Sequence, residues 1–484
     1  MKKTKKLFLL ILGFTSLTLQ SQTLFFSFPF QVSGPSSGNV HPRVALVNDQ
    51  PLVVWGDPSN NHNLMYSHWN GNGFDAPIQL TYDNENTMLG YAEGPVVKTK
   101  GDSVYICYVS MGTNEHRVYL RRSFDGGQTF SDTILVNDRS FGSMLEYANM
   151  ALDENGNPMI IFIRGESAQN PKYVFYRSND AGNTFTTELN ATPDTSSMPC
   201  ECCPAAISVE NDNIYLTYRN NVNNIRDFYV SISDNGGISF DSLRRMDNTN
   251  WFSNNCPTSG ASSIISGDSL ISVYMAIENN KSMIKANTLN KINLVAGPEY
   301  YADQSVITGS FTMNYPEIDG NGDTIGIVWQ DNRTGVAKTY ISVSTTGLSG
   351  LSQPQIISDF TGTVHQNPHL VFKNGIFHIT WKDFANGIVW YRKAAFTNEL
   401  LNLKERNSNA FKVFPNPAND EVSFFGGFDQ NLFVEIYDMN GKLILSRHLE
   451  EGKKINTEEL IPGVYQIKGT SDLFSYSEKL IIQR

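Results

Sequence analysis

The nonapeptides RSFDGGQTF, at residues 122–130, and RSNDAGNTF, at residues 177–185, decide the fold of this chain. They begin 55 residues apart (177 − 122), and a degenerate copy, ISDNGGISF, begins at Ile232 after another step of 55 (232 − 177). An aromatic-rich apolar run precedes each copy. Self-similarity at a fixed step of this size is typical of repeat architectures.

Two further markers recur on a similar step. One is a proline that opens an apolar run, and YANMALD near Ala148 fills its single gap. The other is a strand-like run that ends in a polar turn about a dozen residues later: VVWGD, ICYVS, IFIRG, LTYRN, VYMAI, IVWQD and ITWKD. The markers define seven units, whose prolines are Pro42, Pro95, Pro204, Pro257, Pro316 and Pro368.

The chain reads as all-β, because alternating or continuous apolar runs stand between Gly, Asn and Asp turns without helical periodicity. Each unit is expected to form a four-stranded meander that cannot bury both faces alone. Such units close radially into a β-propeller. We predict seven blades over residues 24–400, with six as the alternative if the third or fifth unit is misread. The run TLFFSFPF near residue 23 would complete the last blade and remove its free edge.

The two full octets resemble the Asp box of sialidases, a motif also called the BNR repeat. In that family the boxes lie on the face away from the active site, so they imply a fold and not a reaction. Glycine allows a positive φ, the Asp and Ser side chains bond to the turn, and the phenylalanine packs between blades. The matching residues are Ser123, Asp125, Gly127, Thr129, Phe130, Ser178, Asp180, Gly182, Thr184 and Phe185.

The beginning of the chain reads as an export signal. Several lysines precede an apolar run from Leu7 to Phe14, and small and polar residues follow around Ser21. This pattern predicts a secretory signal peptide over residues 1–21, and no later segment is long and apolar enough to span a membrane. The formal net charge of −11 argues against a nucleic-acid partner.

The last part of the chain differs in character from the repeats. After a linker at residues 401–410, residues 411–484 contain FKVFPNPANDEVSFF, VEIYDMNGKLIL and IPGVYQIKG. These motifs resemble the small β-sandwich sorting domain of type IX secretion. The resemblance implies the secretion machinery as a partner and a secreted or cell-surface location. The alternative is a β-sandwich binding module. The motif residues are Pro415, Asn416, Pro417, Asn440, Gly441, Pro462, Gly463, Val464 and Tyr465.

One rim of the predicted propeller gathers the polar residues. Loops entering the innermost strands and loops between second and third strands share this rim, where loops on a rigid scaffold commonly carry function. The rim residues are His41, Arg43, Asp57, Glu93, His116, Arg117, Arg164, Arg219, Arg226, Asp227, Tyr315, Glu317, Asp331, Arg333 and Asp383.

The resemblance to sialidases suggests roles for some of these residues. That family binds the sugar carboxylate with three arginines, here Arg43, Arg219 and Arg333, and a carboxylate ligand suits several guanidinium groups. Arg164 and Arg226 are further ligand-binding candidates. The resemblance implies Tyr315 as nucleophile, Glu317 as its supporting carboxylate and Asp57 as acid/base. Against it, the arginine-isoleucine-proline motif is absent and seven units exceed the six blades of sialidases. The alternative is that these residues form ion pairs between blades and cap turns.

Four of the five cysteines cluster in the same part of the sequence. Cys203 precedes Pro204 as Cys256 precedes Pro257, which makes them equivalent positions in neighbouring blades. A disulfide between blades four and five is expected, with Cys200 or Cys202 as competing partner for Cys256. The alternative is one soft metal ion, zinc or copper(I), held by up to four thiolates. The lone Cys107 is expected to be a buried apolar residue.

Two functions remain open at this stage. The first is an exported glycosidase that acts on extracellular glycans at an arginine-lined carboxylate pocket, without a cofactor. The second is a non-catalytic propeller that binds glycan or protein at the cell surface. A hydrolase requires an acid and a nucleophile or base on either side of one pocket. Convergence of Asp57 and Tyr315 on one pocket would favour the hydrolase, and their scattering would favour the binder.

Overall fold

The protein is described by a computed structural model that covers residues 23–36, 38–90, 92–112, 116–137, 145–165, 170–303, 312–358, 363–397, 411–426, 432–438, 442–449, 454–470 and 475–484. The predicted signal peptide and the predicted linker at residues 401–410 lie outside these ranges, as does the predicted turn at Asn440 and Gly441. The chain separates into two compact units, Met1–Phe396 and Thr397–Arg484. Within the described ranges, no helix combines the length and the apolar character needed to cross a membrane.

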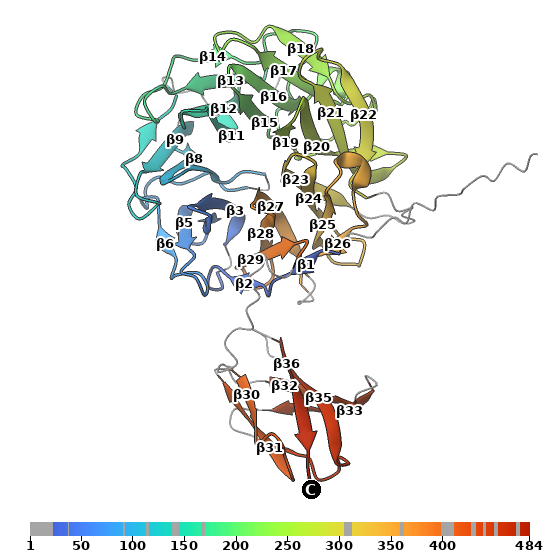
Figure 1. Cartoon of the computed structure of the whole chain (residues 1–484). Helices are drawn as coiled ribbons and strands as arrows, with labels where there is room; N and C mark the ends of the chain where they lie inside the picture. The colour runs from blue at the N-terminus through green and yellow to red at the C-terminus, as the bar shows by residue number, and fades with distance from the viewer. Residues whose placement is uncertain are drawn as a thin grey trace, which may run out of the picture. The chain divides into compact units, whose positions relative to one another are not determined.

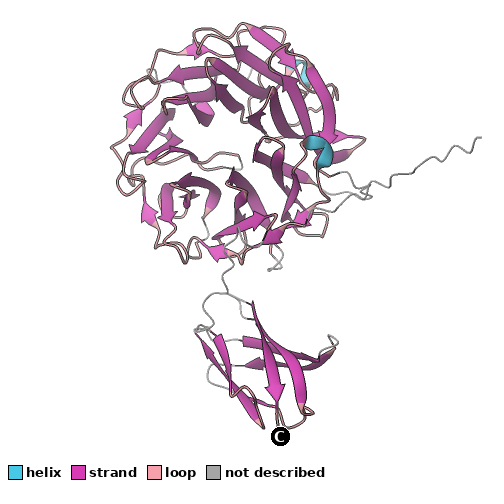
Figure 2. Ribbon diagram, in the orientation of Figure 1, coloured by secondary structure: helices cyan, strands magenta, loops and turns pink. Residues whose placement is uncertain are grey.

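The first unit is built from antiparallel sheets, and its described residues form seven of them (Figures 1 and 2). Blade one contains β3 (Val40–Val47), β4 (Gln50–Asp57), β5 (Asn63–His68) and β6 (Ile78–Gln79). Blade two contains β7 (Val96–Lys100), β8 (Ser103–Met111), β9 (His116–Ser123) and β10 (Ile134–Leu135). Blade three contains β11 (Leu145–Leu152), β12 (Pro158–Arg164), β13 (Lys172–Arg177) and β14 (Leu189–Asn190).

The remaining four blades repeat this order along the chain. Blade four contains β15 (Ala206–Glu210), β16 (Asn213–Arg219), β17 (Phe228–Ser233) and β18 (Ser242–Arg245), with a short 3-10 turn η1 (Val222–Asn224). Blade five contains β19 (Ala261–Ser266), β20 (Ser269–Glu278), β21 (Lys281–Asn290) and β22 (Ala296–Tyr301). Blade six contains β23 (Met313–Asn321), β24 (Thr324–Asp331), β25 (Lys338–Ser344), η2 (Leu348–Gly350) and β26 (Gln355–Ile356). Blade seven contains β27 (His365–Lys373), β28 (Ile376–Asp383) and β29 (Ile388–Ala395).

The N-terminal segment completes blade seven, as the sequence predicted. Both β1 (Phe25–Phe26) and β2 (Phe30–Gln31) pair antiparallel with β29, with Phe25 opposite Ala395 and Phe30 opposite Tyr391. Because the last blade takes its outer strand from the start of the chain, the ring is closed by backbone hydrogen bonds.

The first strand of each blade lies at the centre of the ring (Figure 1). These strands contact one another in the order β3, β7, β11, β15, β19, β23 and β27, and β27 contacts β3 again. Such a closed series of inner strands is the arrangement of a β-propeller. The prediction of a propeller with seven blades is therefore confirmed.

Apolar side chains pack between adjacent blades and hold the ring together. Between blades two and three, for example, Cys107 and Val118 pack with Ile160 and Phe162, all of them fully buried. Cys107 is a free thiol in this core, in agreement with the apolar role predicted for it. The phenylalanine that ends each octet packs against the preceding blade, where Phe130 meets Tyr66 at 5.2 Å.

The octets form hydrogen-bonded turns after the third strands of their blades. Asp125 accepts hydrogen bonds from the Ser123 and Thr129 hydroxyls at 2.6 and 2.5 Å. Asp180 accepts the equivalent bonds from Ser178 and Thr184 at 2.8 and 2.6 Å. Third strands run antiparallel to second strands, so these turns lie at the end of the sheets opposite the polar turns that follow second strands.

The recurring proline marks a bulge at the start of the inner strand. The register of β3, β11, β23 and β27 against the second strands shifts at this point. The residue just before the proline or its equivalent has a positive φ in each case: His41 at 48°, Tyr147 at 56°, Tyr315 at 51° and Asn367 at 51°. A bulge bends its strand and redirects a side chain, and here it presents the residue that follows the proline to the centre of the ring.

The second unit contains two sheets around their own core. One sheet has the order β30-β31-β34 and the other the order β33-β32-β35-β36. Buried residues such as Val422, Val434, Ile467 and Leu480 pack between them, which is the arrangement of a small β-sandwich. The strands are β30 (Phe411–Phe414), β31 (Glu421–Gly426), β32 (Leu432–Asp438), β33 (Leu443–Leu449), β34 (Lys454–Asn456), β35 (Gly463–Thr470) and β36 (Ser475–Ile482).

Candidate active site

Three neighbouring cavities follow the inner strands along the centre of the propeller, and we call them together the axial cavity. Their volumes are about 660, 130 and 60 Å³. The two larger ones share Lys98, Glu317 and His369, and the two smaller ones share Arg43, Ala92, Pro204 and Glu317. Inner strands of different blades thus supply the walls of one polar space, of the kind in which propellers can hold ligands.

Arg43 and Glu317 form the charged pair of the axial cavity. Arg43 Nη2 lies 4.0 Å from Glu317 Oε1, and their side chains are 21% and 26% exposed. Arg43 also donates a hydrogen bond to the Pro42 carbonyl at 3.2 Å. Burial lowers the pKa of Arg43, and Glu317 partly offsets that shift. Because this long ion pair leaves other guanidinium donors available, Arg43 can bind a carboxylate from solution.

Glu93 lines the same cavity but is almost completely buried. It accepts a hydrogen bond from the Tyr147 backbone N–H. Burial raises the pKa of Glu93 well above its usual value, although the Tyr147 bond opposes that shift, and nearby Glu146 raises the pKa further. Burial therefore favours the protonated form of Glu93, in which it can donate a proton.

Two histidines lie near Arg43, one of them, His41, buried and the other, His369, half-buried. His369 Nδ1 accepts a hydrogen bond from the Val44 N–H at 3.2 Å, which fixes the tautomer that carries a proton on Nε2. His41 Nε2 bonds to the Gly90 carbonyl, and among the described residues its Nδ1 has no hydrogen-bond partner. Burial and the charge of Arg43 lower the pKa of His41 to about 3 and that of His369 well below its usual value. Both imidazoles are therefore neutral, so they do not repel a cationic Arg43.

Tyr315 and Glu317 lie in the smallest cavity together with Arg43. The two residues flank Pro316 at the bulge of β23, where Tyr315 adopts its positive φ. The structure thus brings the predicted nucleophile, its predicted supporting carboxylate and one predicted arginine into one site.

Asp57 does not line the axial cavity. It stands at the end of β4, where it accepts hydrogen bonds from the Ser36 hydroxyl at 3.1 Å and the Ser59 hydroxyl at 2.6 Å. This environment is that of a turn cap, because short hydroxyl side chains and the Ser59 N–H saturate the carboxylate. The structure does not bring Asp57 and Tyr315 to one pocket. By the criterion stated above, this scattering favours the binding propeller over a hydrolase that uses Asp57 as its acid, so a hydrolase needs another acid in the axial cavity.

Arg219 and Arg226 belong to the interface of blades four and five. Arg219 is 1% exposed and donates to the carbonyls of Ser259, Arg226 and Met275 at 2.8 to 3.2 Å. Arg226 is 2% exposed and donates to the Ser253 carbonyl at 3.0 Å. With their donors committed to the protein, these side chains are not presented to a ligand.

Arg333 and Arg164 are engaged in ion pairs, Arg164 on its own blade and Arg333 both on its own blade and with Asp303, which follows β22 of blade five. Arg333 Nη1 lies 2.5 Å from Asp303, and its Nε donates to Asp331 at 2.8 Å. Arg164 pairs with Glu188. Of the five predicted ligand-binding arginines, Arg43 alone is among the residues that line the axial cavity. The three arginines of a sialidase-like triad therefore do not meet in the described part of the chain.

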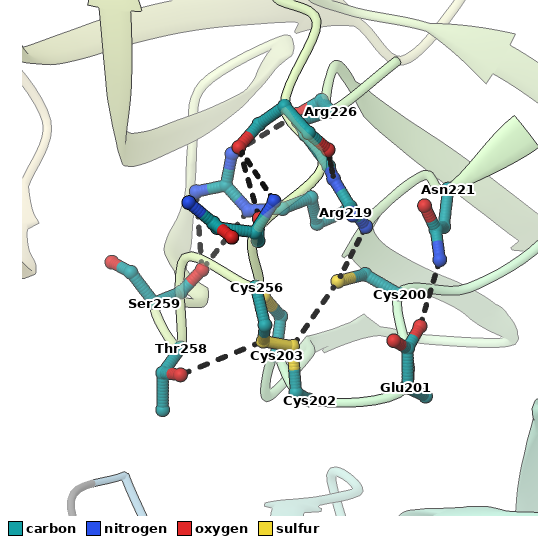
Figure 3. The surroundings of a disulfide bond; sticks show 12 residues. Cys200, Glu201, Cys202, Cys203, Arg219, Asn221, Arg226, Cys256, Thr258 and Ser259 are labelled. Carbon is teal, nitrogen blue, oxygen red and sulfur yellow. Dashed lines mark hydrogen bonds between the residues drawn. A yellow bond between two sulfur atoms is a disulfide. The ribbon is translucent and has the colours of Figure 1, made fainter. Parts of the chain in front are cut away.

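The cysteine cluster forms a disulfide between the loops that precede β15 and β19. The bond joins Cys202 to Cys256, whose Cα atoms are 6.3 Å apart, while Cys200 and Cys203 are buried free thiols (Figure 3). The prediction of a disulfide between blades four and five is confirmed, with Cys202 as the partner of Cys256 and not Cys203. Cys203 is buried beside this disulfide, and its carbonyl accepts a hydrogen bond from the Tyr173 hydroxyl.

The two free thiols differ in acidity. Burial raises the pKa of Cys203, but the hydrogen bond from Cys200 and the charge of Arg219 outweigh it and lower that pKa to about 7. The hydrogen bond to Cys203 and burial raise the pKa of Cys200. At neutral pH Cys203 is thus partly a thiolate and Cys200 its hydrogen-bond donor.

Sequence reasoning placed Glu93 and His41 on the rim without a role, and it did not single out His369 or Lys98. The position of His369 directly after a marker proline could have identified it. It follows Pro368 as Arg43 follows Pro42 and Glu317 follows Pro316, and all three residues line the axial cavity. These three residues follow prolines at which the register of the inner strand shifts, and the bulge places them toward the axis.

Comparison with known proteins identifies the second unit. Residues 412–483 match the family described as the secretion system C-terminal sorting domain. No curated protein matches the chain. Similar solved structures include an ulvan lyase, a polysaccharide lyase bound to a glucuronic acid–rhamnose sulfate saccharide, with 12% identity and a TM-score of 0.53 over 79% of this chain and 99% of that one.

Two other similar structures have lower scores. A protein of unknown function from Dyadobacter fermentans has 12% identity and a TM-score of 0.46 over 66% of this chain and 98% of that one. A Hadza microbial sialidase has 12% identity and a TM-score of 0.40 over 66% of each chain. At these identities the likeness concerns the fold, and the sorting domain indicates the destination. The protein is a β-propeller that carries a type IX secretion sorting domain and is exported, to the cell surface or the medium.

Proposed function

We propose that this propeller is an exported glycosidase that binds a carboxylate-bearing glycan in the axial cavity and hydrolyses its glycosidic bond. One observation carries the proposal: Arg43, Glu93 and Glu317 line the same cavity. They offer a cation for a sugar carboxylate, a carboxylic acid held protonated by burial, and a half-buried carboxylate. A carboxylic acid whose pKa is raised by burial and a second carboxyl group in the same cavity are the pair that glycoside hydrolysis requires.

Arg43 anchors the substrate in this proposal. A guanidinium group binds a planar carboxylate through two parallel hydrogen bonds and cannot lose its charge at working pH. Glu317 orients Arg43 from one side, and the neutral His369 adds no competing charge. The ligand is thus a glycan that carries sialate or uronate groups. The ulvan lyase with the similar fold is described as bound to a saccharide that contains glucuronic acid, so uronates belong among the substrates to be tested.

The reaction then follows from the three side chains beside Arg43. The Tyr315 oxygen attacks the anomeric carbon as its proton passes to Glu317, and Glu93 gives its proton to the departing glycosidic oxygen. Water next attacks the same carbon, gives one proton to Glu93, and releases Tyr315, which recovers its proton from Glu317. Glu93 takes the acid/base role that the sequence suggested for Asp57, because Asp57 caps a turn outside the cavity.

The test measures turnover and binding separately on the full chain. Sialosides and glucuronate-containing polysaccharides are offered, and reducing ends are counted while ultraviolet absorbance detects unsaturated sugars. Glu93→Gln is expected to lower kcat by about 10²- to 10⁴-fold with binding retained. Arg43→Met is expected to weaken binding by about 10- to 100-fold. Glu154→Gln and Arg244→Met, at exposed positions, are the matched controls and should behave as the wild type.

Three results would change this assignment. Binding that depends on Arg43 without any turnover would make the protein a glycan-binding propeller, the second function considered above. Unsaturated products would replace hydrolysis by elimination. Turnover that is equal in Glu93→Gln and the wild type would remove Glu93 from the reaction.

A further inference from the structure

The four sulfur atoms of the cysteine cluster form one compact group. Cys200, Cys202, Cys203 and Cys256 place their Sγ atoms within 4.8 Å of one another (Figure 3). Three of them come from a single turn before β15, and the fourth comes from the loop before β19, 54 residues beyond Cys202. A disulfide between two loops needs only two cysteines. The convergence of four is the donor set of a thiolate metal site.

The charges around this group are unbalanced. Arg219 and Arg226 are both buried, and Arg226 Nη1 donates to Cys200 Sγ at 3.3 Å. Arg219 lies over the rings of Phe228 and Trp251, and its donors reach carbonyl oxygens. Among the described residues, the recorded contacts of these two guanidinium groups include no carboxylate. A buried cation without an anion is costly, so an anionic partner is expected close by.

We propose that Cys200, Cys202, Cys203 and Cys256 are the ligands of one zinc-type divalent metal ion, with Arg219 and Arg226 as its counter-charges. Four thiolates and one divalent ion carry a net charge of −2, which two guanidinium groups cancel. If the four cysteines formed two disulfides, neither arginine would have an anionic partner. If they formed one disulfide and one thiolate, one arginine would still have no anionic partner. The observed clustering also suits the size of the site, since a tetrahedral ion with metal–sulfur bonds of about 2.3 Å holds its sulfurs about 3.8 Å apart.

The Cys202–Cys256 disulfide is then the oxidised, metal-free form of the same site. A dithiol reductant gives two electrons and two protons to the disulfide and becomes a disulfide itself, which leaves four thiols. These thiols lose up to four protons as the divalent ion binds. The ion enters from the side of Cys256, which is exposed, while Cys200 and Cys203 lie beneath. Arg226 bonds to a ligand sulfur and so acts as an outer partner of the site.

Cobalt substitution tests the ligand set directly. The full chain is reduced, freed of metal and titrated with Co²⁺. We expect one equivalent to bind with a thiolate-to-cobalt charge-transfer band and the visible bands of a tetrahedral ion, which Zn²⁺ then abolishes. Cys203→Ser and Cys256→Ser should lose this spectrum, whereas Cys107→Ser, which removes the buried cysteine of another interface, should keep it. A wild type without these bands, or bands unchanged by Cys256→Ser, would overturn the proposal.

Two further measurements do not depend on removing a ligand. Arg226→Met is expected to weaken zinc binding by about 10- to 100-fold in competition with a chelator, and Arg226→Lys, which keeps the charge, by less. Zinc should also protect the wild type from oxidation by a thiol oxidant, which in the metal-free chain links Cys202 to Cys256 as detected by peptide mass spectrometry. Equal zinc affinity in both Arg226 variants and the wild type would refute the charge argument. Equal oxidation with and without zinc would refute the site.

Discussion

At the scale of single residues, the octet turns show how one carboxylate organises a bend. Thr184 donates to Asp180 from its hydroxyl at 2.6 Å and from its N–H at 2.8 Å, and Ser178 adds a third bond. The degenerate octet of blade four has Asn235 at the same place, and it accepts from the Ser239 N–H at 3.0 Å while its own amide donates to the Ser239 hydroxyl. An asparagine therefore preserves most of the turn.

We accordingly predict that Asp180→Ala lowers the melting temperature of the propeller by about 1 to 3 °C, and Asp180→Asn by less. Hydrogen bonds from Thr184 lower the pKa of Asp180 to about 2. A carboxylate with a depressed pKa stabilises the fold above its usual pKa of about 3.9, and this contribution is lost as the pH falls toward 2. The difference in the free energy of unfolding between Asp180→Ala and the wild type should therefore become smaller between pH 4 and pH 2. Urea unfolding at each pH measures this difference. A difference that widens in acid would contradict this account.

For Glu93, the contribution to folding stability changes with pH in the opposite direction. Burial raises its pKa well above the usual value, so the folded state holds the proton more tightly than the unfolded chain does. Folding is then relatively less favourable as the pH rises above about 4.3, the usual pKa of a glutamate, until the raised pKa is reached. Glu93→Gln, which cannot ionise and still accepts the Tyr147 N–H bond, should be the more stable protein at neutral pH. Unfolding midpoints measured from pH 4 to pH 8 should diverge in favour of the variant, with Glu154→Gln parallel to the wild type.

At the scale of structural elements, the strand β2 helps to close the ring, and its contribution to stability can be tested. Phe30 of β2 lies edge-on to Trp69 at 4.8 Å between ring centres and packs beside Tyr391 of β29. Phe28, two residues earlier, is 49% exposed. The two phenylalanines therefore offer a matched comparison within one segment.

Phe30→Ala should destabilise the propeller by about 2 kcal/mol, because it removes a half-buried aromatic side chain from the closing blade, and should lower its melting temperature by about 3 °C. Phe28→Ala should leave it within about 0.5 kcal/mol of the wild type. Calorimetry of the full chain gives both values. Equal effects of the two substitutions would mean that β2 does not contribute to closure.

The elements were more accessible to sequence reasoning than the site was. Octets recur in three units and marker prolines in six of the seven, all on a similar step. Both markers depend on local turn chemistry, so the number of blades could be predicted from their spacing. Whether an arginine is available to a ligand depends on contacts with residues far away in the sequence. Arg219 reaches the carbonyl of Met275, and Arg333 reaches Asp303. Composition cannot distinguish these buried arginines from Arg43, which remains available because its nearest carboxylate is 4.0 Å away.

At the scale of the whole molecule, the chain combines a propeller with a separate sorting domain. Each unit has its own core, and the contacts divide after Phe396. A chain that ends at residue 410 should therefore fold as a propeller and retain the melting temperature of that unit, yet fail to leave the producing cell. Fractionation with an antibody to the propeller measures this. Normal export of the shortened chain would contradict the role of the sorting domain.

The most direct test of the central claim is a crystal structure of Glu93→Gln with the acidic saccharide that the assays select, because this variant should bind without turnover. We expect the sugar carboxylate to bind Arg43 inside the axial cavity, with the glycosidic oxygen within hydrogen-bond distance of the side chain at position 93 and the anomeric carbon facing Tyr315. A saccharide bound outside the axial cavity, or one whose carboxylate makes no contact with Arg43, would contradict it.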